Sequence, residues 1–242
     1  MPTRANTEDP RIVAGMAAQG KLRESRLAAG ERRVGWKAGL GTAQAMETAS
    51  LAAPLAGFLT TASLASGMTT TGGLSIDGWR NAKLEPEIAV RVGADVSAGA
   101  DRRTVQAAIS GVAPAIEIVD LGDPGDIEQV LAENIFHRAF VFGPFSDVSG
   151  AELAAARLSV LRDGHEPQTG IDPAAALGDL VEVVRAVADQ LPLAGDELRA
   201  DDVVRTGSVV PAIAIAGGER FEVTLQDAGS IALVIAPAAG TG

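Results

Sequence analysis

Two glutamates separated by a single proline, Glu85 and Glu87, form the pattern in this sequence that most directly suggests chemistry. In an extended strand the side chains of residues i and i+2 point to the same face, so the two carboxylates should lie side by side. The alternate residues Ile88, Val90 and Val92 would then face the core. Two like charges this close repel each other unless the strand edge is in water or a cation lies between them. The pair therefore indicates a solvated strand edge or a cation site.

A third glutamate, Glu117, interrupts the apolar run 114–119. This run is typical of a buried strand, where an unpaired carboxylate is strongly destabilising, so Glu117 needs a partner. Glutamates from two strands would together form an all-oxygen site, which suits Mg²⁺ or Mn²⁺ far better than Zn²⁺. From spacing alone the simpler interpretation is the default: the first two glutamates lie in water and Glu117 pairs with an arginine.

Lys37 lies in the glycine-flanked segment GWKAGL, residues 35–40. The chain has only three lysines beside 17 arginines, so a lysine in an apolar run is a candidate acid or base, a role that arginine cannot fill. The alternative is a lysine at a strand end whose ammonium group reaches water. Both interpretations are consistent with the sequence.

The elements that must position these residues are short. Eight apolar runs broken by glycine, proline and aspartate predict a β-rich body, and they cover residues 34–40, 87–92, 114–119, 139–142, 158–161, 203–210, 221–225 and 231–235. Helices are predicted over 5–32, as one or two leading helices, and over 103–109, 125–133 and 173–191. Asp163–Gly164 and Gly217–Gly218 predict antiparallel hairpins, and residues 69–73 predict a loop.

The composition excludes several classes of protein. With 242 residues and 47% hydrophobic side chains, the chain can fill one core of about 200–250 residues. The formal net charge of −11 argues against a nucleic-acid partner. Because there is no cysteine, disulfides, thiolate metal sites and cysteine nucleophiles are excluded. The sequence shows no secretion signal and no run near the ~18–20 apolar residues of a membrane span, so we expect a cytoplasmic protein.

Seven short segments follow one another in a specific order. They are GWKAGL (35–40), GFLT (57–60), LEPEIAV (84–90), PAIEIVD (114–120), AEN (132–134), RTGSVVPAIAI (205–215) and VTLQDAGSIAL (223–233). Together they resemble the 2-keto-4-pentenoate hydratase and 4-oxalocrotonate decarboxylase family of the fumarylacetoacetate hydrolase superfamily, over most of the chain. The resemblance implies an α+β fold, a mixed β-sandwich roll with peripheral helices. It implies a catalytic domain over 34–242 after a helical N-terminal extension over 1–33.

The resemblance also implies a site. In this family Mg²⁺ or Mn²⁺ is held by glutamates that match Glu85, Glu87 and Glu117, and a 2-oxo acid binds the metal through its carboxylate and keto oxygens. Lys37 matches the lysine that acts as acid or base or orients the substrate. The substrate-binding residues that the resemblance implies are Leu40, Gly207 and Ser208.

The implied activity is that of a lyase. The segments GFLT and QDAGS look more like the decarboxylase, so we expect decarboxylation of an unsaturated 2-oxo acid; the hydratase that adds water to a 2-hydroxydienoate is the alternative. After GFLT the family usually has an aspartate, whereas this chain has Thr61, which cannot act as a general base near neutral pH. This departure keeps a different class open: a non-catalytic metal- or keto-acid-binding subunit of a homologous enzyme. By analogy we expect a homo-oligomer, with no membrane partner.

Two further expectations concern other polar residues. His137 and His165 lie away from the glutamate strands in the sequence, so no histidine ligand is expected. If the substrate carries a second carboxylate, Arg80, Arg91 or Arg138 are the candidates to bind it.

Overall fold

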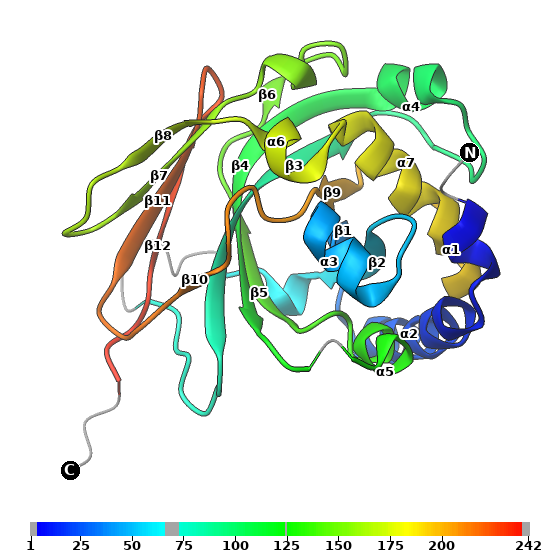
Figure 1. Cartoon of the computed structure of the whole chain (residues 1–242), viewed down its shortest axis with the longest axis horizontal. Helices are drawn as coiled ribbons and strands as arrows, with labels where there is room; N and C mark the ends of the chain where they lie inside the picture. Colours follow the sequence, from blue (N-terminus) through cyan, green and yellow to red (C-terminus); the bar gives the residue numbers. More distant parts are fainter. Residues whose placement is uncertain (1–3, 66–72, 124, 239–242) are drawn as a thin grey trace.

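A long curled sheet and a smaller second sheet form the framework of the protein (Figure 1). The structure is a computed structural model, and it describes residues 4–65, 73–123 and 125–238. The loop predicted at 69–73 therefore lies outside the described residues except for its last glycine. No helix in the described parts of the chain is both long and apolar enough to cross a membrane.

The first sheet contains the strands that carry the glutamates and the lysine. Its order is β2-β1-β9-β3-β4-β5, with β10 beside β3 and β6 beside β4. All neighbouring strands are antiparallel except β1 and β9, which run parallel. The strands are β1 (Arg33–Gly39), β2 (Leu55–Thr60), β3 (Ala82–Val92), β4 (Ile109–Asp120), β5 (His137–Phe142), β6 (Ser146–Asp147), β9 (Val203–Arg205) and β10 (Ile213–Ala214).

The second sheet is antiparallel throughout, in the order β12-β11-β7-β8. Its strands are β7 (Leu158–Arg162), β8 (Gln168–Ile171), β11 (Arg220–Leu225) and β12 (Gly229–Val234). The predicted hairpin at Asp163–Gly164 joins β7 to β8. The hairpin predicted at Gly217–Gly218 is wrong, because β10, which precedes it, pairs with β3 in the other sheet. A glycine turn reverses the chain, but it does not determine which sheet accepts each flanking strand.

The helices lie around the concave side of the first sheet (Figure 1). They are α1 (Arg4–Glu8), α2 (Pro10–Ala28), α3 (Ala43–Ala49), α4 (Arg102–Ala108), α5 (Ile127–Ala132), α6 (Pro173–Leu177) and α7 (Leu180–Gln190), with short 3-10 turns η1 (Thr61–Ser63), η2 (Leu153–Ala155) and η3 (Leu191–Ala194). The single helix predicted over 173–191 is wrong. Gly178, at φ 73° and ψ −151°, ends α6, and the Asp179 side chain accepts a hydrogen bond from the Val181 backbone N–H to begin α7.

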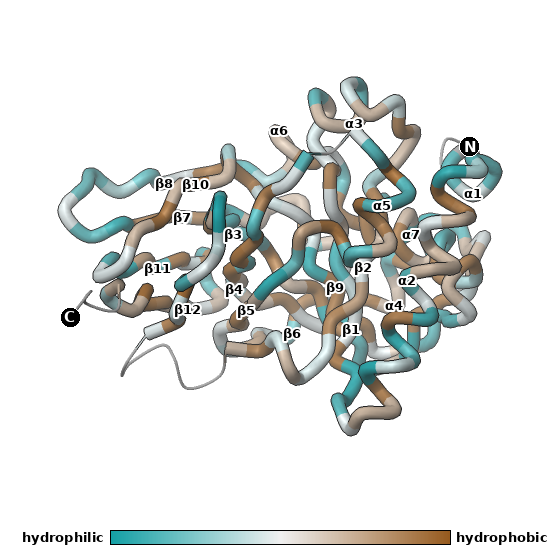
Figure 2. The backbone as a smooth tube through the Cα atoms, turned by 90° about the horizontal axis from the view of Figure 1, so that it is seen from below, coloured by the Kyte–Doolittle hydropathy of each residue, from teal (hydrophilic) through white to brown (hydrophobic). Residues whose placement is uncertain are grey.

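One continuous hydrophobic core joins the helices to both sheets. Ile12 and Met16 of α2 and Val184 of α7 belong to the same cluster as Ile88 and Val90 of β3. Figure 2 shows hydrophobic stretches gathered where strands and helices meet, and hydrophilic ones in outer turns such as that between β7 and β8. The predicted alternation along β3 is confirmed, since Ile88 and Val90 face this core and the glutamates face the other way.

One predicted strand is shorter in the structure than expected, and a buried strand of the first sheet was not predicted. The run 203–210 forms a strand only over Val203–Arg205, because it passes between β1 and β3 and then leaves the sheet. The strand β2 was not among the predicted runs, although its segment GFLT was part of the family resemblance. Its residues are all buried, so it shows no alternation of polar and apolar side chains that could mark it.

An ion-pair network attaches α2 to β1. The buried Asp196 carboxylate pairs with Arg23 of α2 and, at 2.7 Å, with Arg33 of β1. Arg33 also pairs with Asp202. The Arg23 and Arg33 guanidinium groups lie 5.4 and 5.3 Å from the centre of the Trp36 ring. Asp196 thus holds together elements that are distant in the sequence.

Replacing Asp196 with asparagine is expected to lower the free energy of unfolding by roughly 3 kcal/mol at pH 7, because Arg23, Arg33 and the more exposed Arg199 lose a buried partner. Burial alone raises the pKa of Asp196, but the hydrogen bond from Arg33 and the nearby positive charges lower the pKa below its ordinary value of 3.8. Such a carboxylate stabilises the folded state above its unfolded pKa and loses that contribution as the pH falls through its folded pKa. Urea unfolding at pH 7, 5 and 3 measures the difference in the free energy of unfolding between wild type and the Asp196 variant. This difference should have its full size at pH 7 and 5 and should shrink below about pH 3.8.

Asp163→Asn is the matched control, since the Asp163 carboxylate is 57% exposed and 3.6 Å from Arg220. Its effect should stay within about 0.5 kcal/mol. A difference between wild type and the Asp196 variant that does not change with pH would contradict the assignment to this carboxylate.

Candidate active site

The strand register brings the three predicted glutamates together. Glu85 of β3 lies opposite Glu117 of β4, and Glu87 follows two residues later on the same face. One carboxylate oxygen of each lies within 4.8 Å of the others. Glu87 and Glu117 are fully buried, whereas Glu85 keeps partial exposure. The three carboxylates therefore form one cluster that reaches solvent on the side of Glu85.

Two buried cations contact this cluster. Lys37 of β1 and Arg205 of β9 are opposite each other in the parallel pairing, so their side chains point to the same face. The Lys37 Nζ atom donates hydrogen bonds to Glu117 Oε1 at 2.6 Å and to the Ile135 carbonyl at 3.2 Å. Arg205 Nη2 lies 2.6 Å from Glu117 Oε2, and Nε lies 3.8 Å from Glu87 Oε2. The expected pairing of Glu117 with an arginine is confirmed, and Glu117 also belongs to the triad. The expectation that Glu87 lies in water is wrong, because its side chain is fully buried.

A glycine makes room for Lys37. Gly57 of β2 is directly opposite Lys37 in the antiparallel register. A Cβ atom at this position would lie 3.0 Å from Lys37 Cγ and 2.8 Å from the side-chain oxygen of Asn134. The glycine of the GFLT segment thus permits the close approach of β2 to the lysine.

His137 also contacts the cluster, which its distance in the sequence did not predict. Its Nδ1 atom is 2.6 Å from Glu117 Oε1, and its Nε2 atom is 2.8 Å from Ser63 Oγ. Burial lowers the pKa of His137 to about 4, so the ring is neutral near pH 7. An ionised carboxylate can only accept, so we assign the proton to Nδ1, which donates to Glu117, while Nε2 accepts from the Ser63 hydroxyl. The pairing of β5 with β4 causes this contact.

The three carboxylates differ in their protonation. Burial raises the pKa of Glu85 to about 7, with a further rise from the charge of Glu117. Burial likewise raises the pKa of Glu87 to about 8, and the charge of Arg205 offsets only part of this rise. Burial would raise the pKa of Glu117 too, but Arg205, Lys37 and the hydrogen bond from His137 outweigh it and hold the pKa well below the ordinary value. Glu117 is therefore the permanent anion of the group.

The turn that presents the Ile135 carbonyl to Lys37 is strained. Asn134, Ile135 and Phe136 all have positive φ, at 60°, 55° and 59°. The Asn134 side chain holds this turn to β2: its amide nitrogen donates to the Phe58 carbonyl at 2.9 Å and its oxygen accepts from the Phe58 N–H at 2.8 Å. Each left-handed non-glycine residue costs about 1–2 kcal/mol, so this paired contact is needed to keep the turn in place.

Asn134→Ala is expected to lower the free energy of unfolding by about 2–5 kcal/mol, since it leaves a buried N–H and C=O of Phe58 unpaired and weakens a left-handed position. Urea unfolding measures this loss. Asn81→Ala is the control, because the Asn81 side chain makes one hydrogen bond, to the Leu121 carbonyl, at an exposed position. If both variants lost the same free energy of unfolding, the Asn134 side chain would contribute no more than an exposed hydrogen bond, which would contradict its role in holding the turn.

The chemistry of the carboxylates fits a divalent metal ion. Across the described residues, Glu87 Oε1 and Oε2 are buried and make no hydrogen bond, and the partner of Glu117 Oε2 is Arg205. Buried polar atoms of this kind require a partner, and carboxylate oxygens are the ligands that Mg²⁺ and Mn²⁺ prefer. When all groups are ionised, three carboxylates face two cationic side chains, Lys37 and Arg205, which leaves one negative charge uncompensated. Glu85, Glu87 and Glu117 are thus the residues that would hold the metal.

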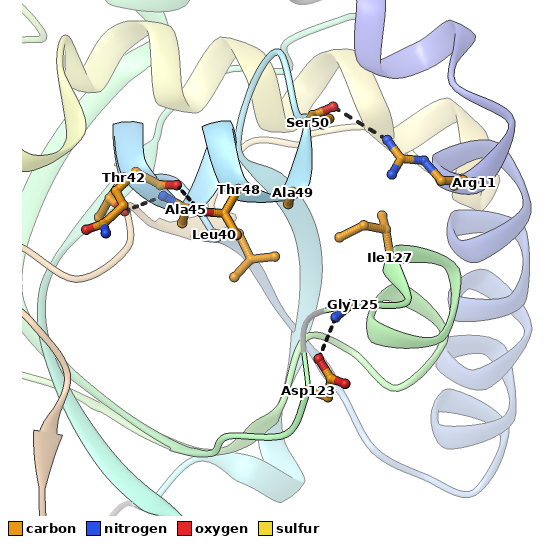
Figure 3. A pocket seen from close by; sticks show the side chains of 11 residues that line it. Arg11, Leu40, Thr42, Ala45, Thr48, Ala49, Ser50, Asp123, Gly125 and Ile127 are labelled. Carbon is orange, nitrogen blue, oxygen red and sulfur yellow. Dashed lines mark hydrogen bonds between the residues drawn. The ribbon is translucent and has the colours of Figure 1, made fainter.

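The predicted substrate-binding residues lie just past the ends of β1 and β9, the strands that carry Lys37 and Arg205. Leu40, just past the end of β1, lines a cavity of about 490 Å³ bounded by α3, Ile127 of α5 and the chain around Asp123 (Figure 3). None of the three glutamates lines this cavity. Gly207 and Ser208 follow β9 after one residue, Thr206, and the Ser208 hydroxyl donates to the Val210 carbonyl at 2.6 Å.

The Thr61 side chain is bonded to the backbone next to β1. Its side-chain oxygen accepts a hydrogen bond from the Arg32 backbone N–H at 3.0 Å. The hydroxyl that the chain has in place of the family's aspartate is therefore engaged with the start of β1. The hydroxyl that meets the charged cluster is that of Ser63, through His137.

Two of the three predicted arginines, Arg91 and Arg138, pair with carboxylates outside the triad. Arg91 pairs with Asp147 at 2.8 Å, and Arg138 lies 3.8 Å from Asp120. The arginine that contacts the glutamates is Arg205, which the sequence reasoning missed. The available signal was an arginine inside the apolar run 203–210, at the start of the segment RTGSVVPAIAI.

Known proteins resemble this chain over most of its length. No family model matches the chain. The chain is 30% identical to 2-hydroxyhexa-2,4-dienoate hydratase of Comamonas testosteroni over 222 residues, which is 88% of this chain and 81% of the hydratase. It belongs to the hydratase and decarboxylase family of the fumarylacetoacetate hydrolase superfamily. Within this family it is also 27% identical to 4-oxalocrotonate decarboxylase of Pseudomonas putida over 220 residues, 88% of this chain and 81% of that one.

Solved structures confirm the expected fold. The 4-oxalocrotonate decarboxylase from Pseudomonas putida G7, complexed with magnesium and adipate, matches with a TM-score of 0.77 at 27% identity, over 90% of this chain and 83% of that one. Fumarylpyruvate hydrolase from Pseudomonas aeruginosa, in complex with Mn²⁺ and pyruvate, matches in fold with a TM-score of 0.62 at 18% identity, over 85% and 90% of the two chains. The curled sheet, second sheet and N-terminal helix are thus the α+β fold of this superfamily.

Proposed function

We propose that this chain is a divalent-metal-dependent lyase that acts on an unsaturated 2-oxo acid, most like 4-oxalocrotonate decarboxylase. The observation that carries the proposal is the buried Glu87 carboxylate, which makes no hydrogen bond among the described residues, within a triad of glutamates in a member of a family of hydratases and decarboxylases. Glu85, Glu87 and Glu117 would hold Mg²⁺ or Mn²⁺. The metal would supply a Lewis acid for the carboxylate and keto oxygens of the substrate and for the negative charge that develops during reaction.

Lys37 is the proposed proton donor. An ammonium group has three N–H donors, and two of them bind Glu117 and the Ile135 carbonyl. The third is available to the substrate. Since the nitrogen is held from two sides and is almost completely buried, it can deliver a proton to a defined position with little reorganisation.

Decarboxylation is favoured over hydration by the position of Thr61. Addition of water needs a base that activates the water, and Thr61 offers only a hydroxyl that is bonded to the Arg32 backbone. Loss of CO₂ needs stabilisation of the carbanion that remains and then a proton, which Lys37 supplies. The proposed substrate-binding residues are Leu40, Gly207 and Ser208, and the chain is proposed to act as a homo-oligomer.

The test is a metal-dependent assay of 4-oxalocrotonate for CO₂ release and of a 2-hydroxydienoate for hydration. Release of CO₂ that requires Mg²⁺ or Mn²⁺ is the expected result. Hydration without CO₂ release would favour the hydratase. Metal binding that oxalate tightens, without turnover of either compound, would favour the non-catalytic subunit, and Thr61→Asp should then create activity. Absence of metal binding by wild-type protein would overturn the proposal.

A further inference from the structure

Arg205 is a buried cation whose donors are mostly unused. Its side chain has no exposure to solvent. Nη2 lies 2.6 Å from Glu117 Oε2 and forms an ion pair with it. In the part of the chain that the structure describes, Nε and Nη1 make no hydrogen bond. Unpaired buried donors on a charged group are strongly destabilising, so a ligand that accepts from them would offset a real cost.

The Arg205 guanidinium group lies between an aromatic ring and a carboxylate. Its carbon lies 5.6 Å from the centre of the Phe140 ring, on β5. Phe140 is opposite Glu117 in the register of β4 and β5, so the ring and the carboxylate flank the arginine. A planar guanidinium presents its donors in a fixed fork that matches a carboxylate.

The same arginine touches two of the three carboxylates that a metal ion would need. It lies 2.6 Å from an oxygen of Glu117 and 3.8 Å from an oxygen of Glu87. A divalent cation on these oxygens would repel the guanidinium and would compete with it for their lone pairs. Metal binding alone must therefore weaken the contacts of Arg205, and an anion beside the metal would restore a partner to it.

We propose that Arg205 couples metal binding to substrate binding: it compensates the charge of Glu117, beside Glu87, in the metal-free protein and donates to the carboxylate of the 2-oxo acid in the loaded site. This inference rests on the proposed function. It makes Arg205 a binding residue of the site and predicts that metal alone binds weakly, whereas metal and a dicarboxylate anion bind cooperatively.

The experiment is isothermal titration of Mn²⁺ into metal-free protein, with and without oxalate as the anion. Arg205→Leu is expected to bind Mn²⁺ at least tenfold more tightly than wild type without oxalate, because the competing cation is gone. The tightening by oxalate should fall at least tenfold in this variant. Arg205→Lys keeps the charge without the fork, so it should bind Mn²⁺ as weakly as wild type and still lose the oxalate effect.

Arg91→Leu is the matched control. Arg91 also lies over a phenylalanine, 5.3 Å from the Phe145 ring centre, and also pairs with a carboxylate, Asp147. Because it contacts none of the three glutamates, its loss should leave both Mn²⁺ affinity and the oxalate effect as in wild type. Thermal unfolding of each variant checks that it folds.

Two results would overturn the inference. One is an Arg205→Leu variant that binds Mn²⁺ no more tightly than wild type; the other is an oxalate effect that survives in both Arg205 variants. If the leucine variant does not fold, the oxalate effect in Arg205→Lys decides the question. Failure of wild type to bind Mn²⁺ would overturn the proposed function itself, whereas normal binding with unaffected variants would overturn only the role of Arg205.

Discussion

Glu87→Gln is expected to weaken Mg²⁺ and Mn²⁺ binding at least 100-fold without a loss of folding stability. The variant removes a ligand charge from the centre of the triad, where both oxygens of Glu87 lack a hydrogen-bond partner among the described residues. Burial raises the pKa of Glu87 to about 8, so the side chain is largely protonated in the metal-free protein at pH 7. Glutamine closely mimics that protonated form, and the free energy of unfolding should stay within about 1 kcal/mol of wild type.

Isothermal titration with each metal and urea unfolding of the metal-free protein measure the two quantities separately. Glu222→Gln is the matched control, because Glu222 also lies on a strand and pairs with an arginine, Arg220, at 2.7 Å. It should bind metal as wild type does. Retention of wild-type metal affinity by Glu87→Gln would show that the triad is not the metal site, and the proposed function would then fail with it.

Lys37→Met is expected to lower turnover by about 10²–10⁴-fold, the usual range for loss of a general acid or base. Metal binding should be unchanged or tighter, because the variant removes a positive charge that lies 2.6 Å from Glu117. The contrast between lost turnover and retained metal distinguishes a proton donor from a residue that merely holds the triad. Glu117 keeps Arg205 and His137 as partners, so the loss of stability should be about 1–3 kcal/mol.

The assay is metal-dependent turnover, followed by titration of Mn²⁺ into the same preparation. Lys83→Met is the control: Lys83 lies two residues before Glu85 on β3, keeps some exposure and should leave turnover unchanged. Turnover within tenfold of wild type in Lys37→Met would contradict the role of Lys37 as the proton donor. Simultaneous loss of metal binding and turnover would instead make it a positioning residue for Glu117.

Features governed by neighbouring residues were predictable. The alternation along β3 placed Glu85 and Glu87 on one face and Ile88 and Val90 on the other, because side chains of a strand alternate whatever its partners are. The need of Glu117 for a charged partner followed from its apolar surroundings in the sequence. By contrast, the break in the helix over 173–191 depends on the backbone conformation of the single residue Gly178, which apolar periodicity does not reveal.

The sequence by itself determined the identity of the chain's family, the α+β class and a set of carboxylates suited to a hard divalent cation. Only the tertiary structure decided which cations meet those carboxylates. Arg205 reaches them because β9 is inserted between β1 and β3, and His137 because β5 pairs with β4. These contacts join residues far apart in the chain, and strand order is set by the packing of the whole sheet rather than by local spacing. The electrostatic balance of the site is therefore a property of the fold.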